Sequence, residues 1–357
     1  MAFSQQLLLK FPALLMHWNK HQNTRKMPWK GEKNPYKIWL SEIILQQTRV
    51  EQGLKYYEKF VSNFPDVHSL AKAKDEKVYK LWEGLGYYSR CKNLIETARF
   101  ISKNLTGKFP DAFENILALN GVGHYTASAI ASFAYNLPHA VVDGNVFRVL
   151  SRFFGIKKPI DSTEGKKIFS QLAFELLDKK QPGIYNQALM DFGAVICKPQ
   201  IPLCQACILQ KDCYAFKNKQ VNKLPVKEKK LKIKTRWLNY LVIEHNKKVY
   251  IRKRNAKDIW KNLFEFVLIE MSSETTAARV LNNAEKTGIL KKNSYKILEA
   301  SPVYTQQLSH QKIMGRFIKV NLEKELTLSG FKAVPMKQLI RYAFPRFINA
   351  YFKKEQH

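Results

Sequence analysis

Residues 119–146 read LNGVGHYTASAIASFAYNLPHAVVDGNV, and this stretch decides the fold prediction. A helical pattern over 111–119 stops before Gly121, and the sequence from Gly121 to Gly123 predicts a tight turn. The small residues of 125–133 then predict a helix that starts at once. Two glycines at a turn before a helix leave backbone N–H groups free to bind a phosphate. Alone, such a turn is often only a tight connection.

A lone acid follows twenty residues after this turn. Asp143 ends an apolar run and precedes Gly144, Asn145 and a second helical pattern over 146–154. An aspartate before a helix is most often an N-cap, and that is the simplest interpretation of Asp143 by itself. A phosphate-binding turn placed shortly before a carboxylate favours a functional role as well.

The length and the charge limit the choice of partner. A chain of 357 residues predicts two or three domains, and its net charge is +31 at pH 7. Such an excess implies a polyanionic partner, with nucleic acid as the leading candidate and an anionic membrane surface as the alternative. No run approaches 18 apolar residues, so we expect no membrane-spanning segment.

The N-terminal residues do not resemble a secretory signal, because they lack a basic start and a small-residue cleavage site. Their apolar spacing predicts an amphipathic helix with Ser4 as its cap. We therefore expect an intracellular, cytoplasmic protein. Thiols stay reduced there, so clustered cysteines indicate a metal site instead of disulfides.

Residues 1 to about 217 show helical periodicity, and residues from 237 onward show strand patterns. Between them, 217–236 holds nine basic residues against one acid, which predicts an extended charged linker. Further helices are expected over 36–57 (as one helix or a broken pair), 69–81, 89–105, 162–177 and 185–195. In the second part, strands are expected over 240–244, 248–252, 264–270 and 317–322, and helices over 273–287 and 336–353.

Four of the five cysteines fall in one loop over 197–213 with the spacing C-x6-C-x2-C-x5-C; they are Cys197, Cys204, Cys207 and Cys213. Four thiolates so close together would repel one another and oxidise unless a metal held them. Zinc sites usually pair two short C-x2-C knuckles, and this loop has only one. The uneven spacing favours an iron–sulfur cluster over zinc. Cys91 stands apart and is expected to be a buried apolar residue.

Together, the turn, the acid and the cysteine loop resemble the helix-hairpin-helix DNA glycosylases that carry an iron–sulfur cluster. Within them the chain is most similar to the adenine DNA glycosylase (MutY) family. The motifs that carry this resemblance are PYKIWLSEIILQQTRV over 35–50, LWEGLGYYSR over 81–90 and NQALMDFGAVICKP over 186–199. The resemblance implies a mainly α catalytic region with a six-helix barrel and an iron–sulfur helical domain over 1–217. A basic linker over 218–236 and a smaller α+β Nudix-like domain over 237–357 would follow it.

The resemblance also assigns the catalytic residues. Breaking an N-glycosidic bond needs a proton for the base and a negative group near the sugar. Glu42, an acid in a strongly apolar helix, matches the family's general acid, and Asp143 matches the group that stabilises the sugar cation. Tyr125 and Asn145 match residues that line the site and orient Asp143. Without the family match, Glu42 would be an ordinary paired helix residue.

Contacts with DNA follow from the same resemblance. Gly121 and Gly123 would hold a phosphate, while Gln47 and Tyr87 would wedge into the base stack. Ser309 and His310 would read 8-oxoguanine on the opposite strand, although Leu308 replaces the usual phenylalanine before them. Two further departures are Lys30, where arginine is common, and the absence of the Nudix catalytic signature. The latter implies that this domain does not hydrolyse nucleoside diphosphates.

The implied function is a monomeric, monofunctional bacterial glycosylase with one 4Fe–4S cluster, associated with the nucleoid through DNA binding. It would remove adenine opposite 8-oxoguanine or guanine in double-stranded DNA. In the endonuclease III type a lysine stands at the position of Tyr125 and forms a Schiff base, which tyrosine cannot do. The alternatives are an endonuclease III-like glycosylase/lyase, a non-catalytic iron–sulfur DNA-binding module and a zinc transcription factor.

Overall fold

The computed structural model describes residues 3–228 and 233–354, which divide into two compact units. The described residues of Met1–Lys72 and Asn93–Lys230 make up the first unit. Those of Ala73–Lys92 and Leu231–His357 make up the second, so the chain contributes to it twice. The sequence predicted a single change of domain around 218–236. Within the described ranges, no helix is both long and apolar enough to cross a membrane.

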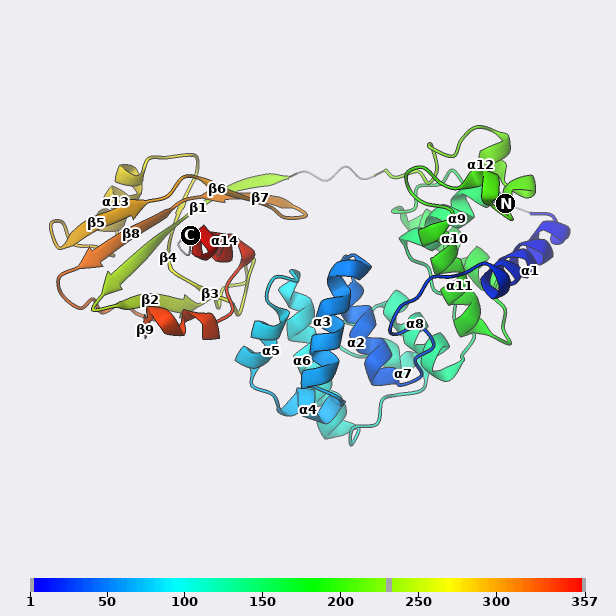
Figure 1. The fold of residues 1–357 in the computed structure, drawn as a ribbon, viewed down its shortest axis with the longest axis horizontal. Helices are drawn as coiled ribbons and strands as arrows, with labels where there is room; N and C mark the ends of the chain where they lie inside the picture. The colour runs from blue at the N-terminus through cyan, green and yellow to red at the C-terminus, as the bar shows by residue number, and fades with distance from the viewer. Residues whose placement is uncertain (1–2, 229–232, 355–357) are drawn as a thin grey trace. The chain divides into compact units, whose positions relative to one another are not determined.

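The first unit is helical, as predicted (Figure 1). Its helices are α1 (Gln5–His21), α2 (Pro35–Leu45), α3 (Val50–Asn63), α4 (Val67–Lys72), α7 (Phe113–Leu117), α8 (His124–Tyr135), α9 (Gly144–Phe154), α10 (Thr163–Glu175), α11 (Pro182–Val195) and α12 (Tyr214–Lys217), with 3-10 turns at Cys204–Ala206 and Gln210–Asp212. Helix α6 (Tyr88–Asn104) begins in the second unit and continues into the first.

The apolar face of α1 is buried, as its spacing predicted. Ser4 caps this helix by accepting a hydrogen bond from the Leu7 N–H. Phe11 packs against Phe153 of α9 with ring centroids 4.9 Å apart. Trp18 packs edge-on against Phe192 of α11 at the same distance. The core of the first unit therefore joins α1 to α9 and α11.

Two predicted helices are broken in the structure. The single helix expected over 69–81 is the pair α4 and α5 (Asp75–Trp82), because Lys74 between them has an extended backbone. The helix expected over 336–353 is a 3-10 helix at Met336–Arg341 followed by α14 (Arg346–Lys354), with Pro345 just before α14. A proline ends helical hydrogen bonding and suits a helix start. The pattern over 36–57 is the broken pair α2 and α3.

The second unit is built on a nine-stranded sheet with the long strand β1 at its centre. Its strands are β1 (Lys234–His245), β2 (Lys248–Lys253), β3 (Phe264–Glu265), β4 (Val267–Met271), β5 (Tyr295–Ala300), β6 (Tyr304–Gln307), β7 (Gln311–Gly315), β8 (Phe317–Leu322) and β9 (Lys332–Pro335). Strand β1 pairs antiparallel with β2 and β4 and parallel with β7 and β8. Strands β5, β6, β7 and β9 were not expected from the sequence.

Two helices cover opposite faces of this sheet. Side chains alternate between faces along a strand. Ile318 and Val320 of β8 therefore share a core with α13 (Ala277–Lys286). Phe317 faces the other way and stacks on Tyr351 of α14 with ring centroids 4.4 Å apart. The result is the α+β unit that the sequence predicted.

Polar contacts at the C-terminal end of α5 attach residues 73–92 to the rest of the second unit. Lys80 Nζ donates to the carbonyl of Tyr342 at 3.0 Å, and the Phe344 N–H donates to Glu83 Oε1 at 2.8 Å. The amide of Asn262 donates to the Tyr79 hydroxyl at 2.7 Å. The domain boundary drawn at 217 therefore misses one part of this unit.

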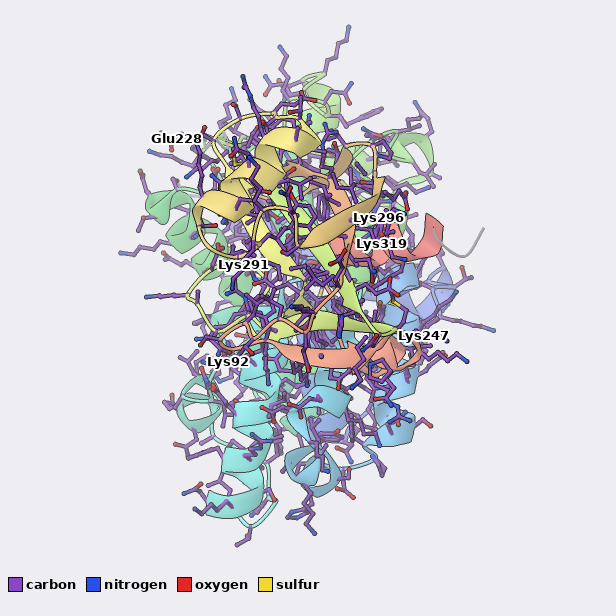
Figure 2. The ribbon with its side chains drawn as sticks, turned by 90° about the vertical axis from the view of Figure 1, so that its left-hand side faces the viewer. Lys92, Glu228, Lys247, Lys291, Lys296 and Lys319 are labelled. Atoms are coloured by element: carbon purple, nitrogen blue, oxygen red, sulfur yellow. The ribbon has the colours of Figure 1, made fainter. Side chains whose placement is uncertain are left out.

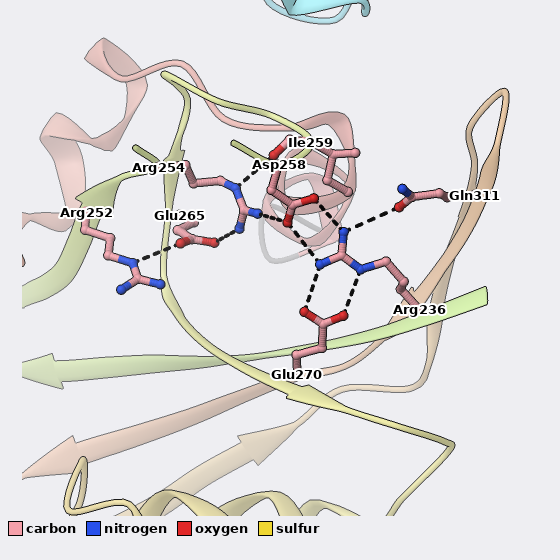
Figure 3. A network of polar contacts seen from close by, with 8 residues as sticks. All are labelled: Arg236, Arg252, Arg254, Asp258, Ile259, Glu265, Glu270 and Gln311. Carbon is pink, nitrogen blue, oxygen red and sulfur yellow. Dashed lines mark hydrogen bonds and ion pairs between the residues drawn. The ribbon is translucent and has the colours of Figure 1, made fainter. Parts of the chain in front are cut away.

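The basic linker ends earlier than predicted. Residues 234–236 are the first residues of β1, and 229–232 lie outside the described residues. Arg236 is also not a free charge for DNA, because it forms two-pronged ion pairs with Glu270 and Asp258 (Figure 3). Arg254 links Asp258 to the buried Glu265 in the same network.

Lys247, Lys291 and Lys296 of the second unit are exposed, whereas Lys319 is half-buried and pairs with Glu244. Figure 2 labels Lys247, Lys291, Lys296 and Lys319 on this unit. Lys296 of β5 and Lys319 of β8 come from paired strands. Part of the net charge of +31 is therefore carried by an ordered sheet as well as by the linker.

Candidate active site and DNA interface

The glycine turn predicted from the sequence lies between α7 and α8. Gly121 has φ +77°, and a Cβ at this position would come within 2.6 Å of Asn93, so glycine is required. Gly123 is the N-cap of α8 and makes no side-chain capping hydrogen bond. Nothing lies within 4 Å of the position that a Cβ of Gly123 would take. The N-terminus of α8 thus has no side-chain cap, which a phosphate contact at this turn requires, and that contact stays a prediction.

Asp143 is the N-cap of α9, and its carboxylate has a fixed orientation. Oδ1 accepts from the Val146 N–H at 2.8 Å, and Oδ2 accepts from Asn145 Nδ2 at 2.6 Å. Burial raises the pKa of Asp143, and these two hydrogen bonds oppose the rise. The capping role that the sequence offered as the simplest one is therefore present, and it leaves the carboxylate at the wall of a cavity.

Arg148, which was not predicted as a site residue, orients the side chain of Asn145. Its Nη2 donates to Asn145 Oδ1 at 2.8 Å and to the carbonyl of Gly193 at 2.7 Å. Its Nε donates to the carbonyl of Cys197 at 2.7 Å. A buried guanidinium with this many acceptors fixes the amide of Asn145 and joins it to the cysteine loop.

Glu42 lies on α2, a helix that is buried almost throughout. Only 7% of the Glu42 side chain is exposed, and burial raises its pKa to about 7. The Tyr125 hydroxyl beside it lowers the pKa, whereas the negative charge of Asp143 raises it further. A carboxyl group with this pKa can hold a proton near neutral pH and give it away.

One cavity of about 520 Å³ brings the predicted catalytic residues together. We call it the catalytic cavity. Its lining includes all four of them, Glu42, Tyr125, Asp143 and Asn145, together with the predicted wedge residue Gln47. The remaining lining residues are Arg25, Met27, Trp29, Leu45, Gln46, Thr48, Val50, Val142, Gly144, Phe147, Gln187 and Met190. Glu42 and Asp143, about 100 positions apart in the sequence, therefore line the same cavity.

Asp191 was not predicted as a site residue. Its buried carboxylate binds Arg25 and Gln187, which line the catalytic cavity. Asp191 of α11 is completely buried and accepts four hydrogen bonds. Its donors are Arg25 at 2.9 Å, Lys30 at 2.9 Å, Asn23 at 3.0 Å and Gln187 at 2.9 Å. Lys30 stands where the family usually has arginine. It thus shares the Asp191 carboxylate with Arg25.

The two predicted wedge residues have the same unusual backbone. Gln47 has φ +55° and Tyr87 has φ +47°, a left-handed region that residues other than glycine seldom adopt. Gln47 follows α2 in the first unit, whereas Tyr87 directly precedes α6 in the second unit and is 41% exposed. Such strain persists where the surrounding structure imposes it, often at binding sites.

The predicted lesion-reading residues form a hairpin tip in the second unit. Ser309 and His310 are exposed between β6 and β7, and the Leu308 N–H donates to the Gln311 carbonyl at 2.8 Å. The Ser309 and Tyr87 hydroxyls lie 2.5 Å apart. Two residues predicted to meet DNA from separate motifs are therefore in direct contact.

The four clustered cysteines line one small, mainly apolar cavity with Arg152 and Pro202. Arg152 Nη1 lies 3.5 Å from Cys197 Sγ and also donates to the Lys198 carbonyl. Within the part of the chain that the structure describes, no three histidine, cysteine or acidic side chains converge as ligands of one metal ion. Thiols around a shared space fit a cluster that binds each at a different iron. Cys91 is fully buried, as predicted.

Comparisons with known proteins agree with this picture. Residues 40–173 match the family model described as HhH-GPD superfamily base excision DNA repair protein, and residues 239–354 match the NUDIX domain model. A solved structure of a thermostable thymine-DNA glycosylase is 29% identical, covers 60% of this chain and 98% of its own, and has a TM-score of 0.55.

Two relatives cover most of the chain. The adenine DNA glycosylase of Buchnera aphidicola subsp. Schizaphis graminum (strain Sg) is 38% identical over 260 residues, which are 72% of this chain and 74% of that protein. The adenine DNA glycosylase of Buchnera aphidicola subsp. Acyrthosiphon pisum (strain APS) is 39% identical over 259 residues, or 72% and 73%. This chain is a member of the adenine DNA glycosylase family.

Proposed function

We propose that this DNA glycosylase hydrolyses the N-glycosidic bond of adenine opposite 8-oxoguanine or guanine in double-stranded DNA. The observation that carries the proposal is the catalytic cavity, where buried Glu42 shares a wall with Tyr125 and Asp143. Its volume of about 520 Å³ accommodates a nucleotide turned out of the duplex. Membership of the adenine DNA glycosylase family supports adenine as the base.

Glu42 is the general acid in this proposal. It protonates the adenine at N7, so that the base leaves as a neutral molecule. A carboxyl group with a pKa of about 7 is protonated in a useful fraction of molecules at neutral pH. The burial of Glu42 is what raises this pKa and keeps the carboxyl partly protonated at neutral pH.

Asp143 stabilises the positive charge that develops on the sugar, and it does so from a fixed position. Its hydrogen bonds with Val146 and Asn145 orient the carboxylate before the substrate arrives. Arg148 orients Asn145 in turn. Asn145 and Tyr125 are therefore residues that position the two acids.

Binding of DNA is divided between the two units. The open N-terminus of α8, with Gly121 and Gly123, takes a backbone phosphate. Gln47 and Tyr87 enter the base stack, and Ser309 and His310 read 8-oxoguanine on the opposite strand. We assign catalysis to residues 1–72 and 93–217, and lesion reading to residues 237–357 together with 73–92, because the latter belong to one compact unit.

The cofactor proposed for the cysteine loop is one 4Fe–4S cluster held by Cys197, Cys204, Cys207 and Cys213. When bound, the cluster cross-links four points of a loop that has little regular structure. Arg152 supports the loop by donating to the carbonyls of Lys198 and Pro199. We propose a structural role for the cluster and no step of the reaction through it.

The test is a base-release assay on duplexes that carry each of the four bases opposite 8-oxoguanine and opposite guanine. We expect release of adenine alone, with the faster rate opposite 8-oxoguanine. Tight binding without release would favour the non-catalytic DNA-binding module. Borohydride should trap no covalent protein–DNA adduct, because Tyr125 cannot form a Schiff base, and efficient trapping would favour the glycosylase/lyase alternative.

A further inference from the structure

A second cavity lies beside the catalytic cavity in the first unit. We call it the side cavity, and its volume is about 190 Å³. It is lined by residues of α1, of the segment between α1 and α2, of α2, and of the facing ends of α8 and α11. They are Asn19, Trp29, Lys30, Gly31, Glu32, Lys33, Ile38, Ser41, Glu42, Phe133, Gly183, Ile184 and Gln187.

Glu42 stands in the wall that separates the two cavities. Trp29, Glu42 and Gln187 line both of them, whereas Asp143 and Tyr125 line only the catalytic cavity. Trp29 and Glu42 are both less than 9% exposed. Glu42 therefore borders a second space, separate from the one where the flipped nucleotide would lie.

The side cavity has room for water. Its volume is many times the roughly 10 to 15 Å³ of probe space that one water molecule needs. Ser41, Lys30 and Gln187 supply polar atoms to a lining that is otherwise mainly apolar. The side cavity can therefore hold water that enters from the solvent.

The side cavity opens to solvent at one edge. Ile184 lines it and is 48% exposed. Lys33 is also exposed, and its Nζ donates to the carbonyl of Phe133 at 2.9 Å, which ties the segment before α2 to the end of α8. Ile184 and Lys33 line the side cavity and are exposed, so they mark its mouth, where the Lys33 contact joins two lining residues.

The hydrolysis needs a way for water to enter, because each turnover consumes one water molecule while DNA covers the catalytic cavity. Resting on the proposed function, we propose that the side cavity is the water inlet of the reaction. In the step it serves, one O–H bond of water breaks and a bond forms between its oxygen and the sugar C1′. The released proton returns to the Glu42 carboxylate, which had given its own proton to the departing adenine, so atoms and charge balance.

The test uses substitutions that change the width of the mouth. The sugar products then show whether water or methanol reached the sugar. In dilute methanol, the parent protein should give both the hydrolysed sugar and its methyl glycoside. Ile184→Trp should lower the methyl glycoside fraction several-fold, because methanol is larger than water. Lys33→Met, which removes the contact with Phe133, should raise the fraction.

The matched control is Phe174→Trp. Phe174 lies on α10 of the same unit, is also 48% exposed and lines neither cavity. It should leave the fraction unchanged. The proposed water inlet would be wrong if Ile184→Trp and Lys33→Met both released adenine normally and both gave the parent's methyl glycoside fraction.

A second measurement does not depend on activity. In a high-resolution structure of Glu42→Gln with DNA bound, ordered water should run from the mouth at Ile184 to residue 42. A dry side cavity in that complex would overturn the proposal. A parent protein that releases no adenine would instead contradict the proposed function, and the water positions would still decide the inlet.

Discussion

The hydroxyl oxygens of Tyr87 and Ser309 lie 2.5 Å apart, although 222 residues separate them in the sequence. Tyr87 precedes α6 and Ser309 stands at the hairpin tip between β6 and β7. Both were assigned to DNA contacts from separate motifs. One of the two hydroxyls donates to the other, so the DNA contacts proposed for them would have to replace this hydrogen bond.

The first prediction concerns Ser309→Ala. A net loss of one hydrogen bond to 8-oxoguanine amounts to about 1 to 1.5 kcal/mol, which corresponds to a roughly tenfold lower preference for 8-oxoguanine over guanine. Single-turnover rates on the two duplexes measure this ratio. Tyr87→Phe is the control, because it frees Ser309 and keeps the ring that would stack, so its preference should not fall. An unchanged ratio in Ser309→Ala would remove the lesion-reading role from this hydroxyl.

The second prediction is the pH dependence of base release. The general acid must be protonated, and the pKa of Glu42 is about 7. The single-turnover rate should therefore change little between pH 5.5 and 6.5 and fall roughly hundredfold between pH 6 and pH 9. Glu42→Gln should lose release altogether while it keeps its affinity for DNA. A rate that stays constant up to pH 9 would show that another group supplies the proton.

The third prediction concerns the stability of the same variant. The pKa of Glu42 is raised from 4.5 to about 7 on folding, so ionisation opposes folding. This cost is absent below pH 4.5, grows as the pH rises to 7 and is complete above it, where it reaches about 3 kcal/mol. Glu42→Gln should therefore unfold at a higher temperature than the parent at pH 8 and at a similar one at pH 4.5. An equal difference at both pH values would contradict the burial of an ionisable group here.

The sequence predicted those turns, caps and helix breaks that depend only on neighbouring residues in the chain. The turn at Gly121, the cap at Ser4 and the break between α2 and α3 follow from residue types and spacing. The break between α4 and α5 did not, because nothing in Ala73 and Lys74 forbids a helix. The break coincides with the change from the first unit to the second at residue 73.

The candidate site was predicted to a similar extent. Family motifs pointed to Glu42 and Asp143, and the structure places both on one cavity. Arg148 and Asp191 were missed, because a charged residue in a helical pattern is usually a solvated one. Only the fold reveals that Asp191 is buried under four donors. The exposed strand β5 was missed for a related reason, because five of its six residues are exposed and show no alternation.

The fourth prediction tests the cysteine loop. Cys207→Ser should give a protein without the brown colour and the absorption near 400 nm that an iron–sulfur cluster provides. The loop around it has only short helical turns, so loss of the cross-link should also increase its cleavage by proteases. Cys91→Ser is the control for removing a cysteine, because Cys91 is buried away from the cluster loop and should leave the colour unchanged. A colourless parent protein that contains zinc would overturn the assignment.

The fifth prediction contrasts two ion pairs of the first unit. Asp191→Asn keeps the shape of the side chain but removes the buried negative charge that Arg25 and Lys30, which are 22% and 29% exposed, share. Because water reaches both cations, we expect a cost of about 1.5 to 3 kcal/mol for the weakened hydrogen bonds, which lowers the melting temperature by roughly 5 °C. Because Arg25 and Gln187 line the catalytic cavity, adenine release below the melting transition should slow as well. In the control Glu164→Gln, an exposed pair with Lys158 is lost, and the melting temperature should change by only about 1 to 2 °C. Equal effects of the two substitutions, measured by thermal unfolding, would show that Asp191 does not anchor the cavity wall.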